Sequence, residues 1–200
     1  VLVNVVQQSS GAFQCGLGSS QLQGLLTSIS VTQRNFLGTG NSVGVTLQNN
    51  SVLRRFDFSY IDPYFTDDGV SLGYTLSYRE LDQGEANIAN YTSDIASGSV
   101  IMGIPLTETD TLSLVMSLSR NQIGTFPGIT PPEIIDYINE LGKRTFSTWG
   151  LQAGWSRDSR NKYFAPTRGA YQRVGAEVAL PGSTQEAYKL FYEIARYWPL

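Results

Sequence analysis

The sequence predicts an all-β fold, an antiparallel up-and-down transmembrane β-barrel of which about ten strands are present. Ten segments alternate apolar with small or polar residues, as where Leu112, Leu114, Met116 and Leu118 are interleaved mostly with serines. Successive side chains of a strand point to opposite faces, so each segment has one apolar face and one small or polar face. Charged residues collect between the segments, and no stretch could form a membrane-spanning helix. This combination is typical of a barrel with lipid outside and water or protein inside.

The expected strands follow one another with short breaks. Residues 1–8 alternate around Val1, Val3 and Val5 and predict a strand that ends before the break at 9–11. A glycine-spaced strand follows at 11–18. Further strands are expected at 25–31, 41–49, 54–61, 70–81, 95–105, 111–120, 146–157, about 170–180 and 187–198.

The connections between these strands are of two alternating kinds. Segments 19–24, 48–54, 82–94, 121–145 and 181–186 are polar and vary in length. Of the other set, 35–40, 62–69 and 158–169 carry glycine or proline with aromatic residues, and the short turn 106–110 directly follows Pro105. Up-and-down topology places the two kinds at opposite ends of the strands. Variable loops at one end and tighter turns at the other are typical of an outer-membrane barrel. In the segment 35–40, Gly38 and Gly40 can adopt a positive φ without steric cost.

The insertion at 121–145 predicts a single short amphipathic helix in a surface loop. Thr130 and Glu133 flank two prolines, which predicts a capping box with proline at the first helical position. Gly142 stands where such a helix would end. Its apolar face would comprise Ile134, Ile135, Ile138 and Leu141.

The composition argues against several classes of function. A net charge of −3 makes nucleic acid an unfavourable partner. Without histidine and with Cys15 alone, the chain can form no internal disulfide, no Cys/His zinc site and no Ser–His or Cys–His dyad. We therefore expect no metal, no cofactor and no enzymatic activity, and we interpret Cys15 as a small hydrophobic residue.

Three turn segments resemble those of the Omp85 superfamily of outer-membrane barrels. They read Asn-Phe-Leu-Gly-Thr-Gly at 35–40, Asp-Pro-Tyr-Phe-Thr-Asp-Asp-Gly at 62–69, and Asp-Ser-Arg followed by Pro-Thr-Arg-Gly within 158–169. They fall in the order and spacing of that family, and the resemblance spans essentially the whole chain. The residues that carry it, for which we expect a structural role, are Asn35, Phe36, Gly38, Gly40, Pro63, Tyr64, Phe65, Asp68, Gly69, Asp158, Arg160, Pro166, Thr167, Arg168 and Gly169.

The resemblance implies a place for each part of the chain in the bacterial outer membrane. Residues 1–8 are similar to the end of the last periplasmic POTRA domain, and 11–200 to the N-terminal portion of the barrel, strands one to ten of about sixteen. The expected helix falls in an extracellular loop. We expect the chain to be part of a longer protein, because ten strands with two free edges would expose unpaired backbone groups to lipid. Asp57, Arg173, Glu177 and Glu193 alternate with the apolar positions and are expected to face the lumen, and an ion pair of Asp158 and Arg160, near Arg168, would fix a turn.

The resemblance also implies a function without covalent chemistry, the folding and insertion of other barrels. The implied partners are nascent outer-membrane β-barrel proteins, outer-membrane lipid, and the Bam-complex lipoproteins through POTRA domains mostly missing from these residues. Glycine weakens a strand, so the first strand could form a loosely paired lateral seam that receives a substrate strand. This candidate seam comprises Gly11, Ala12, Phe13, Gln14, Cys15, Gly16, Leu17 and Gly18.

Two alternatives remain open at this stage. The glycines of the candidate seam could merely permit a tight bend of the barrel. The turn at 158–169 would also suit an Omp85-type translocation pore, such as a two-partner secretion transporter.

Overall fold

The described residues form one antiparallel sheet of ten strands in sequential order, which confirms the predicted fold class. The structure, a computed structural model, describes residues 10–21, 23–82, 84–85, 90–184 and 186–199. The strand predicted at 1–8 lies outside these residues. The strands are β1 (Gly11–Ser20), β2 (Gly24–Gln33), β3 (Ser42–Asn49), β4 (Leu53–Asp62), β5 (Ser71–Asp82), β6 (Tyr91–Pro105), β7 (Asp110–Thr125), β8 (Thr145–Asp158), β9 (Gly169–Ala179) and β10 (Tyr188–Tyr197).

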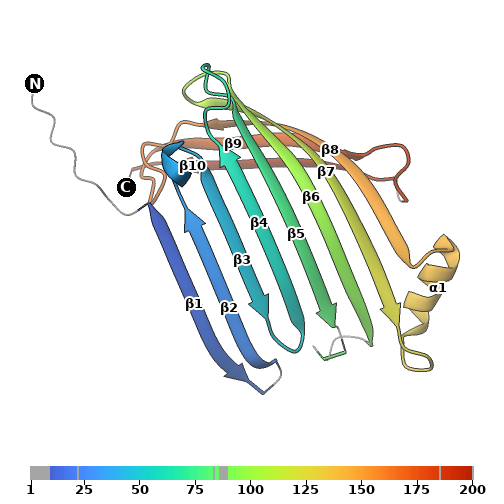
Figure 1. The fold of residues 1–200 in the computed structure, drawn as a ribbon. Helices are drawn as coiled ribbons and strands as arrows, with labels where there is room; N and C mark the ends of the chain where they lie inside the picture. Colours follow the sequence, from blue (N-terminus) through green and yellow to red (C-terminus); the bar gives the residue numbers. More distant parts are fainter. Residues whose placement is uncertain (1–9, 22, 83, 86–89, 185, 200) are drawn as a thin grey trace, which may run out of the picture.

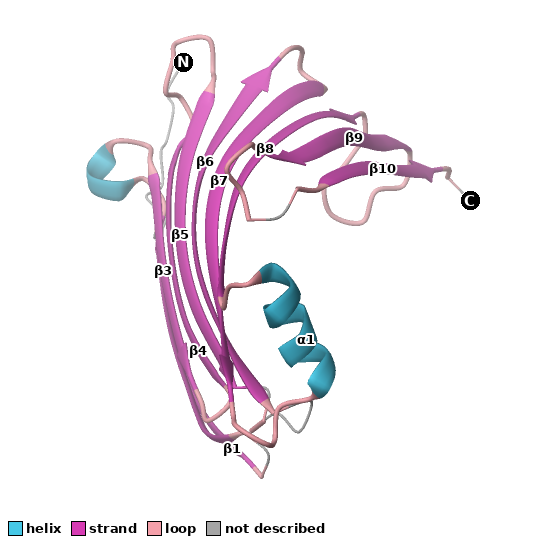
Figure 2. Cartoon of the chain, turned by 90° about the vertical axis from the view of Figure 1, so that its right-hand side faces the viewer, coloured by secondary structure: helices cyan, strands magenta, loops and turns pink. Residues whose placement is uncertain are grey.

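The sheet is strongly curved and is not closed over the described residues. Figure 1 shows β1 at one end of the curve, with β9 and β10 behind the strands that face the viewer. In Figure 2 the sheet bends toward one side, and the helix α1 (Pro132–Leu141) lies on this concave side. The two edges of the described sheet are therefore β1 and β10.

The strand register separates an apolar face from a polar face. Val31, Val45, Phe58 and Leu76 are successive cross-strand partners on β2 to β5, and one position away Ser30, Thr46, Asp57 and Ser77 are partners in the same way. Directly opposite residues of an antiparallel pair point to the same face, so the predicted alternation is confirmed.

Small polar side chains of the second face bond to one another across the strands. The Ser30 and Thr46 hydroxyls lie 3.2 Å apart, and Ser77 donates to Asp57 at 2.9 Å. The other charges predicted to face the lumen share this face, because Arg173 is the cross-strand partner of Glu193, and Glu177 that of Gln152. The polar face thus carries small hydroxyl side chains and charges of both signs, and α1 lies on the same side of the sheet (Figure 2).

Nothing among the described residues covers the apolar face as a second layer. In the part of the chain that the structure describes, the buried hydrophobic residues are Val52, Leu72, Ile123, Ile138 and Phe146, while Leu76 and Met116 on the apolar face are 55% and 50% exposed. A soluble sandwich would bury such rows against another sheet. An outward apolar surface instead suits a sheet that lies in lipid.

The helix α1 forms where the sequence predicts it, but its N-terminus differs from the predicted capping box. The N-cap is Pro131, which makes no side-chain capping bond, while the Thr130 hydroxyl donates to the Asn90 carbonyl at 2.7 Å and accepts from the Phe126 amide. The capping box is wrong because this tertiary contact occupies the Thr130 side chain. The predicted end is confirmed: Gly142 has φ 64°. No helix among the described residues is long and apolar enough to cross a membrane.

The helix packs onto the concave face through part of its predicted apolar stripe. Ile138 is buried with Ile123 of β7 and Phe146 of β8, and Ile134, Leu141 and Tyr91 pack against this group, whereas Ile135 is 39% exposed. The Tyr137 and Phe146 rings lie 5.6 Å apart between centroids. The cluster therefore holds the insertion against the inside of the curved sheet.

The strands β6 and β7 extend further toward α1 than the alternation of apolar residues predicts. Their ladder runs from Pro105 opposite Thr111 to Tyr91 opposite Thr125, whereas the sequence predicts loops at 82–94 and 121–145. Polar pairs maintain this outer part, since Ser93 donates to the Asn121 side chain at 3.0 Å. A ladder of backbone bonds thus continues where apolar periodicity stops.

Replacement of Phe146 by alanine should release α1 without opening the sheet. Burial of this ring fixes the cluster, and a Phe→Ala change in a core costs about 3–5 kcal/mol. We expect tryptic cleavage at Lys143 and Arg144 to accelerate at least tenfold, measured by limited proteolysis of the folded protein. The control Phe126→Ala removes a ring that is 41% exposed and should leave the cleavage rate within about twofold; equal acceleration in both variants would contradict the packing role.

Candidate functional site

The candidate seam lies in β1, an edge strand of the described sheet. It pairs with β2 along its whole length, from Gly11 opposite Gln33 to Ser20 opposite Gly24, and with no other described strand. Nearly all its residues are exposed, with Phe13 at 68% and Leu17 at 77%. The strand is held from one side only within the described residues.

The direction of each backbone group in β1 follows from one hydrogen bond at its start. The Arg34 amide donates to the Ser10 carbonyl at 2.7 Å, which makes these two residues a hydrogen-bonded pair. Such pairs alternate with non-bonded pairs along an antiparallel ladder. Ala12, Gln14 and Gly16 therefore bond to β2. The amides and carbonyls of Phe13, Cys15 and Leu17 point away from β2, toward the open edge.

The same three residues also direct their side chains to the apolar face. Phe13 is the partner of Val31, and Cys15 that of Ile29, both in the outward rows of β2. Ala12 and Gln14 face the concave side with Thr32 and Ser30. Cys15 is a free, exposed cysteine. The open edge thus presents a regular backbone ladder below an apolar row.

The glycines of the candidate seam have different surroundings. A Cβ on Gly16 would lie 2.5 Å from the Ser28 hydroxyl, and one on Gly11 would meet the Gln33 side chain, whereas Gly18 has ordinary contact distances only. Gly16 and Gly11 therefore leave room for side chains of β2. Space for the side chains of β2 is therefore a third explanation of glycine in this strand, beside a weakly paired edge and a bend of the barrel.

The turn 35–40 is closed by its own side chains. The Asn35 carboxamide oxygen accepts from the Gly40 amide at 2.7 Å, and the Phe36 amide donates to the Asn41 carbonyl. Gly38 and Gly40 have φ 81° and 83°, as the sequence predicts, and Asn35 and Leu37 are also left-handed. Next to it, Gln33 donates to the Ser10 hydroxyl at 2.7 Å, so this turn adjoins the start of β1.

The turn between β4 and β5 is more open. The Tyr64 amide donates to the Asp62 carboxylate at 3.1 Å, and the Gly69 amide to the Thr66 carbonyl at 3.0 Å. Gly69 has φ 81°. Tyr64 and Phe65, which follow Pro63, are 78% and 55% exposed, and Asp68 lies in the same turn. Such exposed aromatics at strand ends suit the headgroup level of a membrane.

The turn between β8 and β9 contains the predicted ion pair. Arg160 donates through Nε and Nη2 to the two carboxylate oxygens of Asp158, at 2.8 and 2.6 Å. This bidentate bond raises the pKa of Arg160. The guanidinium also lies 5.0 Å from the Tyr171 ring centroid and 5.3 Å from that of Tyr163. The pair fixes the first part of the turn against the start of β9.

Asn161 holds the second part of this turn and was missed by the sequence prediction. Its side-chain oxygen accepts from the backbone amides of Thr167 and Arg168 at 3.1 and 3.2 Å, and its backbone amide donates to the Arg168 carbonyl. Arg168 therefore contributes backbone atoms to the turn, and the ion pair of Asp158 is with Arg160. The signal available in the sequence was the asparagine itself, a residue that often bonds turn backbone.

The same turn requires glycine at position 169. Gly169 has φ 105°, and an added Cβ would lie 2.8 Å from the Arg160 Cα and closer still to the Ser159 carbonyl. Ala165, one residue before Pro166, is left-handed as well. Each of the three turns is held by hydrogen bonds between its own residues.

Among the described residues, no group of three or more acidic, histidine or cysteine side chains could hold a metal ion.

A curved antiparallel sheet with an apolar convex face and a polar concave face defines a segment of a transmembrane β-barrel. The model of the Omp85 superfamily domain matches residues 35–200. The chain therefore belongs to the Omp85 superfamily, and it is part of a bacterial outer-membrane protein.

The chain is similar to proteins that carry the name BamA. It is 30% identical over 207 residues to the outer membrane protein assembly factor BamA of Neisseria meningitidis serogroup B, covering 99% of this chain and 26% of that relative. BamA of Buchnera aphidicola subsp. Acyrthosiphon pisum is 28% identical over 90 residues, which cover 45% of this chain and 15% of that protein. This chain thus spans about a quarter of the Neisseria relative.

The fold is similar to a solved structure of the same kind. The crystal structure of BamA from Haemophilus ducreyi lacking POTRA domains 1–3 matches with a TM-score of 0.71 and 24% identity, covering 94% of this chain and 37% of that one. This likeness supports the barrel fold.

Gly169→Ala should destabilise the folded protein more than Gly182→Ala. Both glycines have positive φ, 105° and 95°, but an added methyl meets backbone only at position 169. Left-handed strain alone costs about 1–2 kcal/mol, and the clash adds to it. The expected result is a lower guanidinium midpoint for Gly169→Ala, measured by the mobility of folded protein in cold SDS gels. Equal midpoints for the two variants would contradict the requirement for glycine at position 169.

Proposed function

We propose that these residues form the N-terminal part of the barrel of an outer-membrane protein assembly factor. The protein folds and inserts other β-barrels without covalent chemistry, and its first strand is a lateral seam for substrate strands. Nascent outer-membrane barrel proteins and Bam-complex lipoproteins are its partners. The proposal is supported by the similarity to the assembly factor BamA of Neisseria and, above all, by the outward backbone ladder of Phe13, Cys15 and Leu17.

Backbone pairing explains how one protein can act on many substrates. A strand that adds to an exposed sheet edge gains main-chain hydrogen bonds, which depend little on its sequence. The edge of β1 offers donors and acceptors from alternate residues, beginning at Phe13. Any strand of a nascent barrel can therefore use it.

The seam must also let a strand leave. Gly16 and Gly18 remove side-chain packing from the concave face of β1, and glycine in a strand costs conformational entropy. In lipid, by contrast, an unpaired backbone group costs several kcal/mol. An edge that needs a partner but holds it weakly favours exchange of one strand for another.

A proline in place of Cys15 should impair assembly while the barrel still folds. The Cys15 amide points to the open edge, so its loss removes one donor for an incoming strand and no bond to β2. Proline is tolerated at such edge positions. One hydrogen bond contributes about 0.5–1.5 kcal/mol, which corresponds to a two- to tenfold slower assembly of a test barrel by the full-length protein in proteoliposomes.

The matched control is Gln14→Pro, one position away. The Gln14 amide bonds to Ser30 on β2, so this change should weaken the sheet itself and lower the folded fraction. Cys15→Ser separates loss of the thiol from loss of the amide and should assemble at the normal rate. Normal assembly by folded Cys15→Pro would contradict the seam.

Single cysteines on β1 should form disulfides during assembly with single cysteines placed along the last strand of a substrate. Directly opposite Cβ atoms of paired strands lie about 4.5–5.5 Å apart, close enough for oxidation to a disulfide after small adjustments. We expect crosslinks from Cys15 itself, and from Phe13→Cys or Leu17→Cys in a Cys15→Ser background. When the cysteine on β1 moves by two residues, the substrate residue that crosslinks to it should also move by two. Gel mobility and mass spectrometry identify the crosslinked residue.

The crosslinking control is Leu76→Cys in the same background. Leu76 is exposed on the apolar face of β5, but both edges of β5 are paired within the sheet. Crosslinking from Leu76→Cys at the level of β1 cysteines would indicate random collision in the membrane, and an absence of crosslinks from all three β1 positions would exclude the proposed pairing.

A further inference from the structure

The apolar face has a hollow that follows the strand β6. Its floor consists of Ala96 and Gly98, small residues in a row where neighbouring strands carry large ones. Gly98 lies between Leu76 and Leu118, its cross-strand partners. Two adjoining cavities of about 390 and 600 Å³ meet over Gly98, and we call them together the β6 trough.

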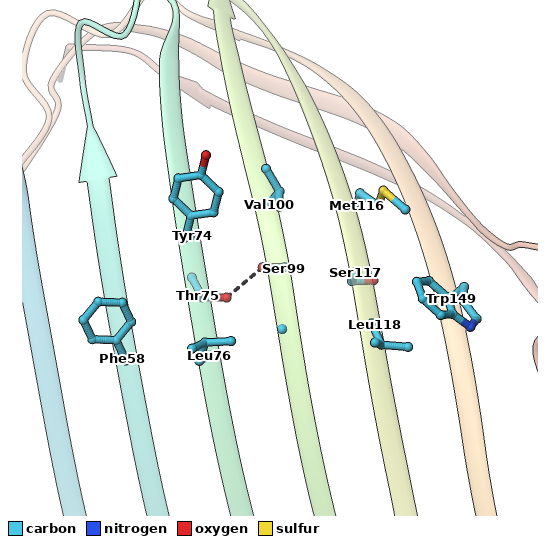
Figure 3. Close-up of a pocket in the computed structure, with 11 residues that line it drawn as sticks. Phe58, Tyr74, Thr75, Leu76, Ser99, Val100, Met116, Ser117, Leu118 and Trp149 are labelled. Atoms are coloured by element: carbon cyan, nitrogen blue, oxygen red, sulfur yellow. Dashed lines mark hydrogen bonds between the residues drawn. The ribbon is translucent and has the colours of Figure 1, made fainter.

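Large side chains of the neighbouring strands form the walls of the β6 trough. Figure 3 shows Phe58 and Leu76 on one side, and Leu118 and Trp149 on the other. Thr75 and Ser99 bond to each other at 2.7 Å, on the opposite face of the sheet. The trough is therefore an apolar concavity on the outer surface of the barrel, of a size typical of ligand sites.

A side chain at position 98 would obstruct this space. A Cβ on Gly98 would lie 3.3 Å from Leu76 Cδ2, closer than an ordinary contact. Further atoms would project into the trough between Leu76 and Leu118. The glycine thus keeps the middle of the trough open.

One end of the β6 trough is polar and carries a cation. Arg120, Tyr78 and Ser147 line it there, in the row that contains Ala96. Arg120 is exposed on the outward face and makes no ion pair among the described residues, whereas Arg54 one row further is paired with Glu80 at 3.4 Å. An outward arginine is unfavourable in hydrocarbon and suits the level of lipid headgroups.

We propose that the β6 trough is a binding site for an anionic membrane lipid. One acyl chain lies over Gly98 between the walls, and the phosphate of the headgroup lies at Arg120. Acyl chains surround the whole barrel, so an apolar hollow alone selects no lipid. Selection comes from the charge at a fixed distance from the hollow, and a cation near a membrane surface contributes about a fivefold preference for anionic lipid. This site is independent of the proposed seam, which lies on β1.

Trp149 provides a direct probe, because its ring lines the trough. The full-length protein would carry Trp149 as its only tryptophan, with Trp155, Trp198 and any others replaced by phenylalanine. It would be reconstituted in vesicles that contain phosphatidylglycerol or phosphatidylcholine with the same brominated acyl chains, which quench a neighbouring indole. We expect half-maximal quenching at about fivefold lower mole fraction of the anionic lipid.

Two variants test the two parts of the site. Arg120→Gln should abolish the preference for phosphatidylglycerol and leave total quenching unchanged. Gly98→Leu should reduce quenching by both lipids, because it fills the trough. The matched controls are Arg196→Gln, an outward arginine on β10, and Ala153→Leu, an outward small residue on β8; neither residue lines the trough, and both variants should behave as the parent.

Two results would overturn the proposal. Equal quenching by the two lipids in the parent protein would mean ordinary contact with surrounding lipid only. A preference that persists in folded Arg120→Gln would show that this arginine does not bind the headgroup. Folding of each variant is checked by its gel mobility before the titration.

Discussion

The structure depends on the pairing of backbone amides and carbonyls, which have no other partner in hydrocarbon. Each interior strand of the described sheet pairs with a neighbour on either side, and described turns such as 35–40 and 158–169 are closed by backbone bonds of their own. Side chains are then free to differ on the two faces. The outward rows can be wholly apolar and the concave rows small and polar because neither face is needed to hold the sheet together. Every special property of β1 arises because this pairing is complete on one side only within the described residues.

Most of the fold could be predicted because the alternation that determines it is local. Leu112 to Leu118 show their two faces without knowledge of any other strand, and Gly142 marks its helix end by its own backbone freedom. The predictions are wrong where contacts with residues distant in the sequence determine the local structure. The Thr130 hydroxyl does not cap the helix because it donates to the carbonyl of Asn90, forty residues away in sequence. The outer parts of β6 and β7 are largely polar, and they are strands because of backbone ladders with each other and with β5 and β8.

The candidate site was predictable to the same degree. Asp158 and Arg160 are two residues apart, so their ion pair follows from the sequence, whereas the role of Asn161 depends on a turn that returns Thr167 and Arg168 to it. For β1, glycine content indicated an unusual strand. It could not show which amides point outward, because the phase of an antiparallel ladder is fixed by the register with β2, through pairs such as Ser10 and Arg34.

The choice of residues whose backbone groups point outward from β1 determines which strands its edge can accept. Phe13, Cys15 and Leu17 direct both their backbone bonds to the open edge and their side chains to the apolar face. A residue of an added antiparallel strand lies directly opposite each of them and points to the same face. The added strand must therefore place apolar residues opposite these three, since a slip of one residue would turn its polar side chains to lipid. The edge thus selects for alternation with a defined phase and tolerates any sequence that has it, which is the property that all strands of outer-membrane barrels share.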